Sequence, residues 1–182
     1  MNTTIEHSFY SKANHLVKVR PMQPEDAHHL VDLFEHMGPD SRYLRFNLTL
    51  TNPDSEAVWE RAKRMARVDP ERDGAWLAFT DLPDQSDAPV AGARYIRIDQ
   101  ETAEAALAVR DDMQNQGIGS ELLAYLAERA REAGIRKMVA IVQGANRSLL
   151  HILQNSSLKV TFESEGSYTT IVAELVEPAA VS

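Results

Sequence analysis

The sequence predicts an α/β fold in which a mixed, mostly antiparallel sheet carries helices on both faces. Segments that alternate as strands, or form short apolar runs, are interleaved with segments of helical periodicity. Three strands follow one another with short connections, which favours antiparallel neighbours. The expected order is βααβββαβαββ, with strands at 16–20, 75–80, 90–98, 103–109, 138–142, 158–162 and 168–175, and helices at 24–37, 54–68, 118–133 and 146–156.

The bulk composition restricts the class of protein. A chain of 182 residues suits one domain, and a formal charge of −8 argues against a general nucleic-acid surface, which needs many lysine and arginine contacts to phosphates. The absence of cysteine excludes disulfides, thiolate metal sites and cysteine nucleophiles. No apolar run reaches about 18 residues and no secretory signal is visible, so we expect a cytoplasmic protein without a membrane or nucleic-acid partner.

Both ends of the chain are expected to lie outside the folded unit. Residues 1–15 are polar and unpatterned, which predicts a loose arm or a partner-dependent element. The folded domain is expected to span 16–176, and 177–182 form a C-terminal tail. Nothing in the pattern indicates an internal domain boundary or an oligomeric state.

The first two helices have recognisable limits and faces. Pro24 suits a first helical position, and Gly38-Pro39 is expected to end that helix. The second helix carries a basic face that we expect to be solvated; docking of an acidic surface or of a phosphate is the alternative. The basic residues of that face are Arg61, Lys63, Arg64 and Arg67.

The stretch from Ala103 to Ala133 has the pattern of a phosphate-binding site. A largely apolar strand at 103–109 is followed by a polar turn and by Gly117-Ile118-Gly119. A helix then repeats apolar residues every four positions, at Ile118, Leu122, Leu126 and Ala130. A strand, a glycine-containing turn and a helix N-terminus together present unpaired N–H groups and a positive helix end to an anion.

The turn Gln114–Gly119, with the sequence QNQGIG, resembles the Gln/Arg-x-x-Gly-x-Gly/Ala signature of the GNAT superfamily of acetyl-CoA-dependent N-acetyltransferases. The element order between residues 16 and 176 is similar to that fold. A narrower similarity, to the catalytic domain of bacterial Pat-type protein lysine acetyltransferases, rests on Arg20-Pro21, Glu25-Asp26, Ser41–Phe46, Ala103-Glu104 and Val109–Asp112.

The resemblance implies a GNAT-like fold, acetyl-CoA as co-substrate, and direct transfer of the acetyl group in a ternary complex to a primary amine. The acceptor that we expect first is the ε-amine of a lysine in a protein. The alternatives are a small-molecule amine acceptor, or a non-catalytic acyl-CoA-binding or sensing module.

The expected cofactor contacts follow from the chemistry of acetyl-CoA. The main-chain N–H groups of Gln116 to Ser120 suit the pyrophosphate, and the main chain of Leu107 to Val109 suits the pantetheine amides if its strand separates from its neighbour. Asn115 stands where relatives often have glycine, and asparagine tolerates left-handed backbone. The candidate cofactor-binding residues, Asn146 being added by the resemblance, are Leu107, Val109, Gln114, Asn115, Gln116, Gly117, Ile118, Gly119, Ser120 and Asn146.

Glu104 is the candidate catalytic residue. It is the one ionisable group in an otherwise apolar strand, and the resemblance places the catalytic glutamate of Pat-type enzymes here. A carboxylate partly desolvated by the strand would have a raised pKa and act as a base toward the amine, directly or through water. The plain alternative is a solvent-facing strand carboxylate. The general acid is left open among Tyr168, Ser156 and water.

We predict no metal site. His28-His29 are expected at a helix surface, and Asp111-Asp112 are expected to shape the turn. His151 is expected at a helix surface, with a place in the acceptor pocket as the alternative. By similarity, the segment 42–46 borders the acceptor site, unless its aromatic residues pack and its arginines are paired.

Overall fold

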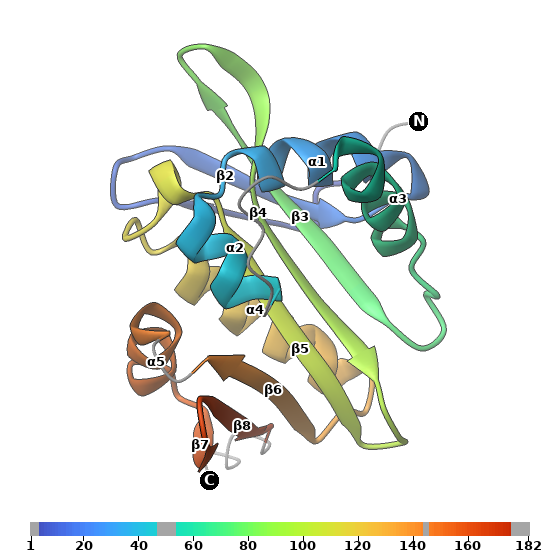
Figure 1. The fold of residues 1–182 in the computed structure, drawn as a ribbon, viewed down its shortest axis with the longest axis vertical. Helices are drawn as coiled ribbons and strands as arrows, with labels where there is room; N and C mark the ends of the chain where they lie inside the picture. The colour runs from blue at the N-terminus through green and yellow to red at the C-terminus, as the bar shows by residue number, and fades with distance from the viewer. Residues whose placement is uncertain (1–3, 47–53, 144–145, 176–182) are drawn as a thin grey trace, which may run out of the picture.

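The computed structural model describes residues 4–46, 54–143 and 146–175. Its strands form one eight-stranded sheet in the order β1-β2-β3-β4-β5-β6-β8-β7, with helices on both faces (Figure 1). Among the strand pairs of these residues, β5 and β6 run parallel and the others antiparallel. The predicted mixed, mostly antiparallel sheet is confirmed.

The strands are β1 (His7–Tyr10), β2 (Leu16–Pro21), β3 (Gly74–Leu82), β4 (Gln85–Arg97), β5 (Thr102–Val109), β6 (Lys137–Gln143), β7 (Lys159–Glu165) and β8 (Tyr168–Glu174). The helices are α1 (Ala27–Glu35), α2 (Pro39–Phe46), α3 (Ser55–Ala66), α4 (Ile118–Glu132) and α5 (Arg147–Gln154), with 3₁₀ turns η1 (Pro24–Asp26) and η2 (Asp111–Met113). Each expected element is present, and β1 and α2 are additional. Within the described chain, no helix is both long and apolar enough to cross a membrane.

Strand β1 corrects the expectation of a loose N-terminal arm. It pairs with β2 from His7 to Tyr10. Just before it, a carboxylate oxygen of Glu6 accepts hydrogen bonds from Trp76 Nε1 (2.9 Å) and from the Tyr125 hydroxyl (2.7 Å). Burial and the bond to Glu6 raise the pKa of Tyr125. Because these partners lie far away in the sequence, no local pattern indicates the strand.

Helix α2 corrects the role given to Gly38-Pro39. Helix α1 ends earlier, at Glu35, and Pro39 is the first residue of α2. Proline is favoured at that position because the first N–H groups of a helix have no intrahelical acceptor. Arg42 of α2 is structural: its guanidinium lies 4.2 Å from the centre of the Phe34 ring, and its Nε donates to the Phe34 carbonyl. The side chains of residues 44–46 lie outside the described residues.

The β3–β4 hairpin is longer than expected. The expected strands end at residue 80 and begin again at residue 90, but Leu82 pairs with Gln85 and the strands turn directly after Leu82. Two register shifts, between Ala78 and Phe79 and between Thr80 and Leu82, accompany this extension. The hairpin consequently projects beyond the helices at the top of Figure 1. The closing β7–β8 hairpin turns around Gly166, between the two strands expected at the end of the chain.

Apolar clusters cover the two faces of the sheet. Alternate residues of β3 divide between them: Trp76 and Ala78 pack in the cluster that includes α4, and Leu77 and Phe79 in the one that includes α1 and α3. The stripe of α4 is fully covered, since Leu122 and Leu126 are 0% exposed. Burial of each such leucine contributes roughly 1.5–3 kcal/mol. One face of the sheet, including β5, is therefore packed on the side of α4, and the opposite face on the side of α1 and α3.

Candidate active site

Strands β5 and β6 separate soon after they begin, and this separation creates the candidate site. Pairing links Thr102, Ala103 and Glu104 of β5 to residues 137–139 of β6 and goes no further. On its other edge, β5 pairs with β4 from Ala103 to Val109. From Ala105 onward, the main-chain groups that point toward β6 have no partner on that strand. The strand therefore separates from its neighbour, which is the condition given above for binding the pantetheine amides to its main chain.

A cavity of about 770 Å³ occupies the separation. It is lined by β5, β6, the turn before α4, and α5. Most candidate residues meet there, namely Glu104, Leu107, Val109, Gln114, Asn115, Gly117, Gly119, Ser120 and Asn146. Gln116 and Ile118 are not among its described lining residues: Ile118 is 1% exposed in the core, and the Gln116 side chain turns toward Ser11. The side chains of these two residues are therefore directed away from the cavity.

The turn before α4 has the conformation of an anion-binding loop. Asn115 adopts a left-handed backbone (φ 61°), as predicted, and so does Gly117 (φ 85°), the residue that precedes the first turn of α4. Gly117 provides no side-chain cap. The first N–H groups of a helix have no intrahelical acceptor. Gly119 and Ser120 of this first turn line the cavity, so the positive end of the helix dipole lies beside it.

Gly119 brings α4 close to α5 and β5. A Cβ atom at this position would lie 2.9 Å from Ile152 Cδ1 and 3.7 Å from Val109 Cγ2. Ile152 and Val109 both line the cavity. A side chain here would displace Ile152, so the glycine permits the close approach of α4 to α5 beside the cavity.

A network of carboxylates holds the turn in place. Asp111 Oδ2 accepts from the Gly38 N–H (2.9 Å), and its Oδ1 accepts from Gln114 Nε2 (3.1 Å). Asp112 makes two bonds, of 2.7 and 2.8 Å, with the guanidinium of Arg110, which is 3% exposed. These acids shape the turn, as the sequence predicts. The described residues contain no cluster of three or more His, Cys, Asp or Glu side chains suited to a metal ion.

Lys12 is a site residue that sequence reasoning missed. Its N–H donates to the Gln116 carbonyl (2.9 Å), and the neighbouring Ser11 hydroxyl donates to Gln116 Oε1 (3.2 Å). The Lys12 side chain lies beside Gly117: its Cγ and Cε atoms are 3.8 Å from where a Cβ would stand. It lines the large cavity. The β1–β2 connection therefore adds a cation next to the turn, a placement that depends on the unpredicted strand β1.

Glu104 lies at the point where β5 and β6 part. It is the last residue of β5 paired with β6, opposite Val139, and it lines the cavity. Its side chain is exposed, which corrects the expected partial burial in an apolar strand. The opening of the strands exposes it. Glu104 also interacts electrostatically with Arg94. Burial lowers the pKa of Arg94, and the negative charges of Asp73 and Glu104 partly oppose this shift.

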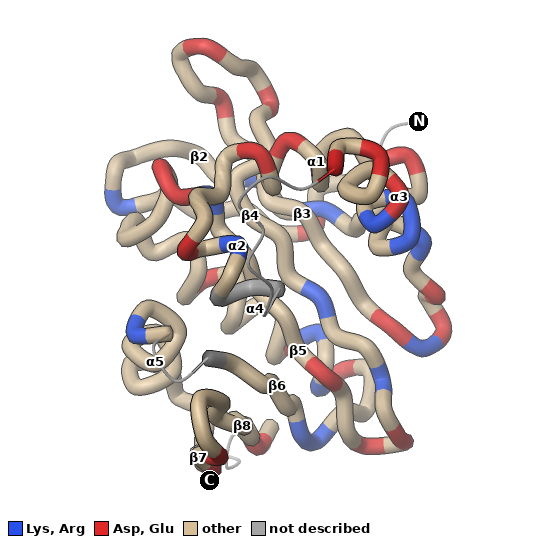
Figure 2. Tube along the Cα trace, in the orientation of Figure 1, with Lys and Arg blue, Asp and Glu red and all other residues tan. Residues whose placement is uncertain are grey.

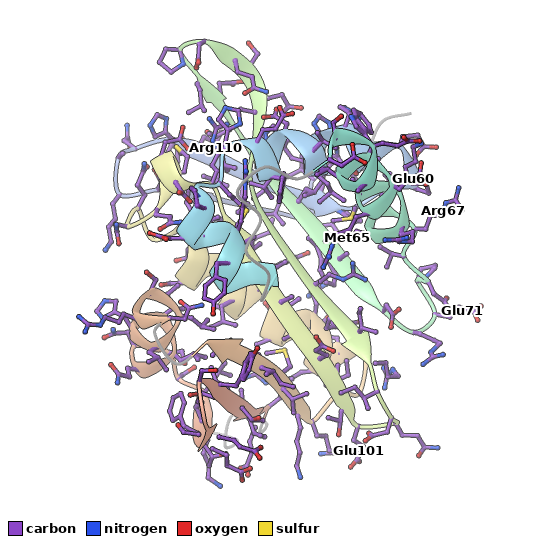
Figure 3. The ribbon with its side chains drawn as sticks, in the orientation of Figure 1. Glu60, Met65, Arg67, Glu71, Glu101 and Arg110 are labelled. Atoms are coloured by element: carbon purple, nitrogen blue, oxygen red, sulfur yellow. The ribbon has the colours of Figure 1, made fainter. Side chains whose placement is uncertain are left out.

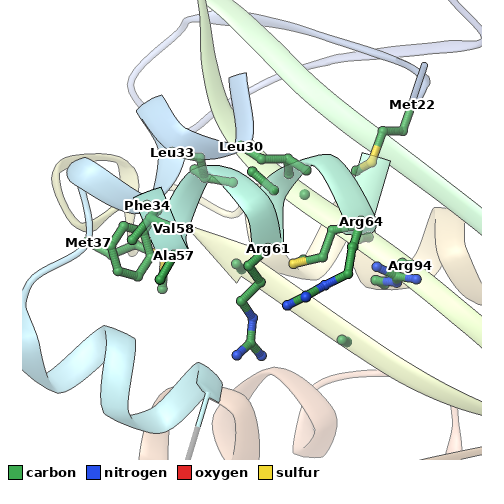
Figure 4. Close-up of a pocket in the computed structure, with 16 residues that line it drawn as sticks. Met22, Leu30, Leu33, Phe34, Met37, Ala57, Val58, Arg61, Arg64 and Arg94 are labelled. Carbon is green, nitrogen blue, oxygen red and sulfur yellow. The ribbon is translucent and has the colours of Figure 1, made fainter. Parts of the chain in front are cut away.

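A second, smaller cavity of about 260 Å³ adjoins the first on the face of β5 that α1 and α3 cover. Both cavities are lined by Met37, Arg61, Ala106 and Ala108. Arg61 and Arg64 of α3 line the smaller cavity (Figure 4) and are exposed, as are Lys63 and Arg67, so the basic face is solvated as predicted. Figure 2 shows the basic positions of α3 in blue along its trace. Lys63 does lie outside, paired with the exposed Glu60.

The remaining candidates divide between structure and cavity. Asn146 caps α5 by accepting from the Leu149 N–H (3.1 Å) and also lines the large cavity. His151 lines that cavity too, on an exposed face of α5. Tyr168 and Ser156 are not among its described lining residues.

The apolar run 138–142 of β6 is not buried on both faces, because Ile141 is 62% exposed where β6 leaves β5.

Comparison with known proteins agrees with this geometry. The profile of the acetyltransferase (GNAT) family matches residues 29–154. An acetyltransferase of Pseudomonas aeruginosa is 26% identical over 134 residues, which cover 73% of this chain and 69% of the relative. The L-amino acid N-acyltransferase MnaT of Escherichia coli is 37% identical over 60 residues, which cover 33% of this chain and 35% of the relative.

Solved structures show the same fold. The GNAT domain of S. lividans PAT superposes with a TM-score of 0.78 at 24% identity, over 92% of this chain and 96% of that one. A cAMP-binding acyltransferase from Mycobacterium smegmatis superposes with a TM-score of 0.63 at 23% identity, over 98% of this chain and 49% of that one, so this chain spans about half of it. GNAT acetyltransferases use acetyl-CoA as a co-substrate. The chain belongs to the GNAT acetyltransferase family and is an acyltransferase enzyme.

Proposed function

We propose that this protein transfers an acetyl group from acetyl-CoA to a primary amine in a ternary complex, with Glu104 as the base. One observation carries the proposal: Glu104 stands where β5 and β6 part and lines the large cavity, and Ala106, the next residue on the same face of β5, lines both cavities. A donor and an acceptor entering from these two sides meet at this carboxylate.

The chain offers a matching group for each part of the co-substrate. The unpartnered main chain of Leu107 to Val109 suits the pantetheine amides, as an added strand would. The N–H groups at the start of α4 suit the pyrophosphate. Lys12, beside Gly117, adds a positive charge at the same place, so we include it among the phosphate contacts. The acetyl thioester then lies at the Glu104 end of the separation.

The proton chemistry assigns the task of Glu104. An alkylammonium group has a pKa of roughly 10.4, so at neutral pH the acceptor must lose a proton before its nitrogen attacks the thioester. An exposed carboxylate takes that proton directly or through one water. The departing thiolate has a conjugate-acid pKa of roughly 8.5 and leaves readily, so water is a sufficient proton donor.

Two acceptor classes have a specific observation in their favour. A protein lysine ε-amine is supported by the sequence resemblance to Pat-type enzymes and by the likeness to the GNAT domain of S. lividans PAT. A small-molecule amine is supported by the cavity of about 260 Å³ that lies on the same face of β5 as Glu104. Both classes need the same donor site and the same base.

The proposal is tested with acetyl-CoA labelled in the acetyl group. Wild type and Glu104→Gln are each incubated with a protein pool and with a panel of small amines. We expect transfer by wild type and a loss of transfer in the variant, with unchanged CoA affinity by calorimetry. Transfer at the wild-type rate by Glu104→Gln contradicts its role, and tight CoA binding without any transfer contradicts the proposed activity.

A further inference from the structure

The smaller cavity has the size and apolar wall of a site for a compact ligand. Its volume of about 260 Å³ lies below the range of about 300–1,000 Å³ typical of sites for drug-sized molecules. Most of its wall is apolar and is formed by α1, α3, β4 and β5. The apolar lining residues are Met22, Leu30, Leu33, Phe34, Met37, Ala57, Val58, Ala62, Met65, Ala93, Ala106 and Ala108.

Three guanidinium groups line this cavity, and nearby carboxylates partly offset their charge: Asp73 and Glu104 act on Arg94, and Glu60 on Arg64. Arg61 and Arg64 come from α3 and Arg94 from β4, and Figure 4 shows all three side chains along one side of α3. Among the described lining residues there is no aspartate or glutamate. Arg94 Nε is buried and has no hydrogen-bond partner within the described part of the chain. A buried donor of this kind needs a partner, which a ligand carboxylate or a water can supply.

The cavity is positioned to deliver an amine to Glu104. Alternation along β5 places Glu104, Ala106 and Ala108 on one face of the strand. Ala106 and Ala108 line both cavities, so the boundary between them runs along this face. A molecule seated on the arginines with its apolar part under α3 has its remaining end directed toward Glu104.

We propose that this cavity binds the acceptor, and that the acceptor is a small primary amine carrying a carboxylate and an apolar side chain, as a free apolar α-amino acid does. The inference rests on the proposed acetyl transfer and selects the second acceptor class. A planar guanidinium binds a carboxylate through two parallel hydrogen bonds, which fixes the orientation of the ligand. The apolar side chain fills the space between α1 and α3.

The step balances without a further reactant. The acceptor nitrogen forms a bond to the acetyl carbonyl carbon, and the carbon–sulfur bond of the thioester breaks. The proton lost by nitrogen passes to Glu104, and the thiolate takes a proton from water. The products are an N-acetyl amino acid and free CoA.

The test compares acceptors that differ in one group. L-leucine is measured against leucinamide and 3-methylbutylamine, which lack the carboxylate, with rates expressed per concentration of unprotonated amine. We expect kcat/KM for leucine to exceed that for the two others by about 10- to 100-fold, as expected for charged hydrogen bonds. Equal values for the three amines overturn the inference.

Arginine variants locate the carboxylate site. Arg94→Gln and the exposed Arg64→Gln should remove most of the preference for leucine and leave leucinamide little changed. Arg67→Gln is the matched control, because Arg67 lies at the outer end of α3 and is not among the described lining residues (Figure 3). A loss of preference in the control equal to that in Arg94→Gln contradicts the assignment. Thermal unfolding of each variant monitors folding.

A binding measurement separates this inference from the proposed function. Calorimetry with N-acetyl-L-leucine in the presence of CoA requires no turnover. Binding that weakens by about 10-fold or more in Arg94→Gln supports the carboxylate site even if transfer is absent, in which case the proposed function alone fails. Transfer confined to protein lysines, with no binding of N-acetyl-L-leucine, overturns the inference and leaves the proposed function intact.

Discussion

The two edges of β5 differ in how completely they are paired. Toward β4 the strand is paired from Ala103 to Val109, whereas toward β6 pairing ends at Glu104. The first edge joins β5 to the core of the sheet. The second leaves main-chain donors and acceptors that a ligand with amide groups can satisfy, much as an added strand satisfies a sheet edge. The candidate site thus lies where the hydrogen bonding of the sheet is interrupted, between β5 and β6.

Elements from distant parts of the chain hold this open edge apart. Helix α5 begins at the Asn146 cap and approaches α4 at Gly119, where Ile152 fills the contact. The β1–β2 connection supports the turn from the other side, through Gln116. The paired edge needs no such supports, because strand pairing alone maintains it. Substitutions at the open edge should therefore affect ligand binding and catalysis more than stability.

The largest effect is expected at Glu104, the last residue before the edges diverge. Glu104→Gln keeps the shape and removes the base, so kcat should fall by about 100-fold or more, the usual contribution of a general base. Steady-state rates with a saturating acceptor measure this effect. Glu163→Gln on the outer strand β7 is the control and should keep the wild-type rate. A variant of Glu104 that retains more than half of the wild-type kcat contradicts the assignment.

A smaller and more selective effect is expected at Gly117. Gly117→Ala forces a side chain into left-handed backbone (φ 85°), which costs about 1–2 kcal/mol and disturbs the N–H groups of the turn. Gly134 has a similar conformation (φ 81°) at the far end of α4, with nothing within 4 Å of its added Cβ, so Gly134→Ala is a matched control.

Chemical denaturation should show a similar loss of stability in both glycine variants. Calorimetry should show weaker CoA binding in Gly117→Ala alone. Equal weakening in both would mean that the turn has no direct contact with the ligand.

The smallest effect is expected at Lys12, which is exposed at the entrance. Lys12→Ala should weaken CoA binding by about 2- to 5-fold, in line with exposed ion pairs, and the difference should shrink as salt is added. Lys18→Ala, on β2 and not among the described lining residues of either cavity, removes the same charge and should bind CoA as wild type does. A salt-independent effect at Lys12 would indicate disturbance of the turn instead of lost charge.

The fold and the conformation of the turn before α4 could be predicted because their signals are local. The glycine-containing turn, the apolar stripe of α4 and the strand before it are neighbours in the sequence, and even the left-handed Asn115 follows from residue type. Strand β1 could not be predicted, because the contacts that hold it in place are distant in the sequence: Glu6, just before the strand, bonds to Trp76 and Tyr125. The placement of Lys12 depends on that strand and was missed with it.

The smaller cavity was beyond the sequence. Arg61 and Arg64 are exposed, as the pattern of α3 predicts, but they also line this cavity, which depends on the packing of α3 over the sheet. The exposure of Glu104 and of Ile141 likewise follows from the separation of β5 and β6. A run of apolar residues does not reveal where a neighbouring strand departs.

The most direct test of the account is a crystal structure of the protein with bound CoA. We predict that the pantetheine arm lies between β5 and β6, with its amides bonded to the main chain of Leu107 to Val109 and the pyrophosphate on the N–H groups of Gln116 to Ser120. A structure in which CoA binds elsewhere, or in which β5 and β6 pair continuously beyond Glu104, would contradict it.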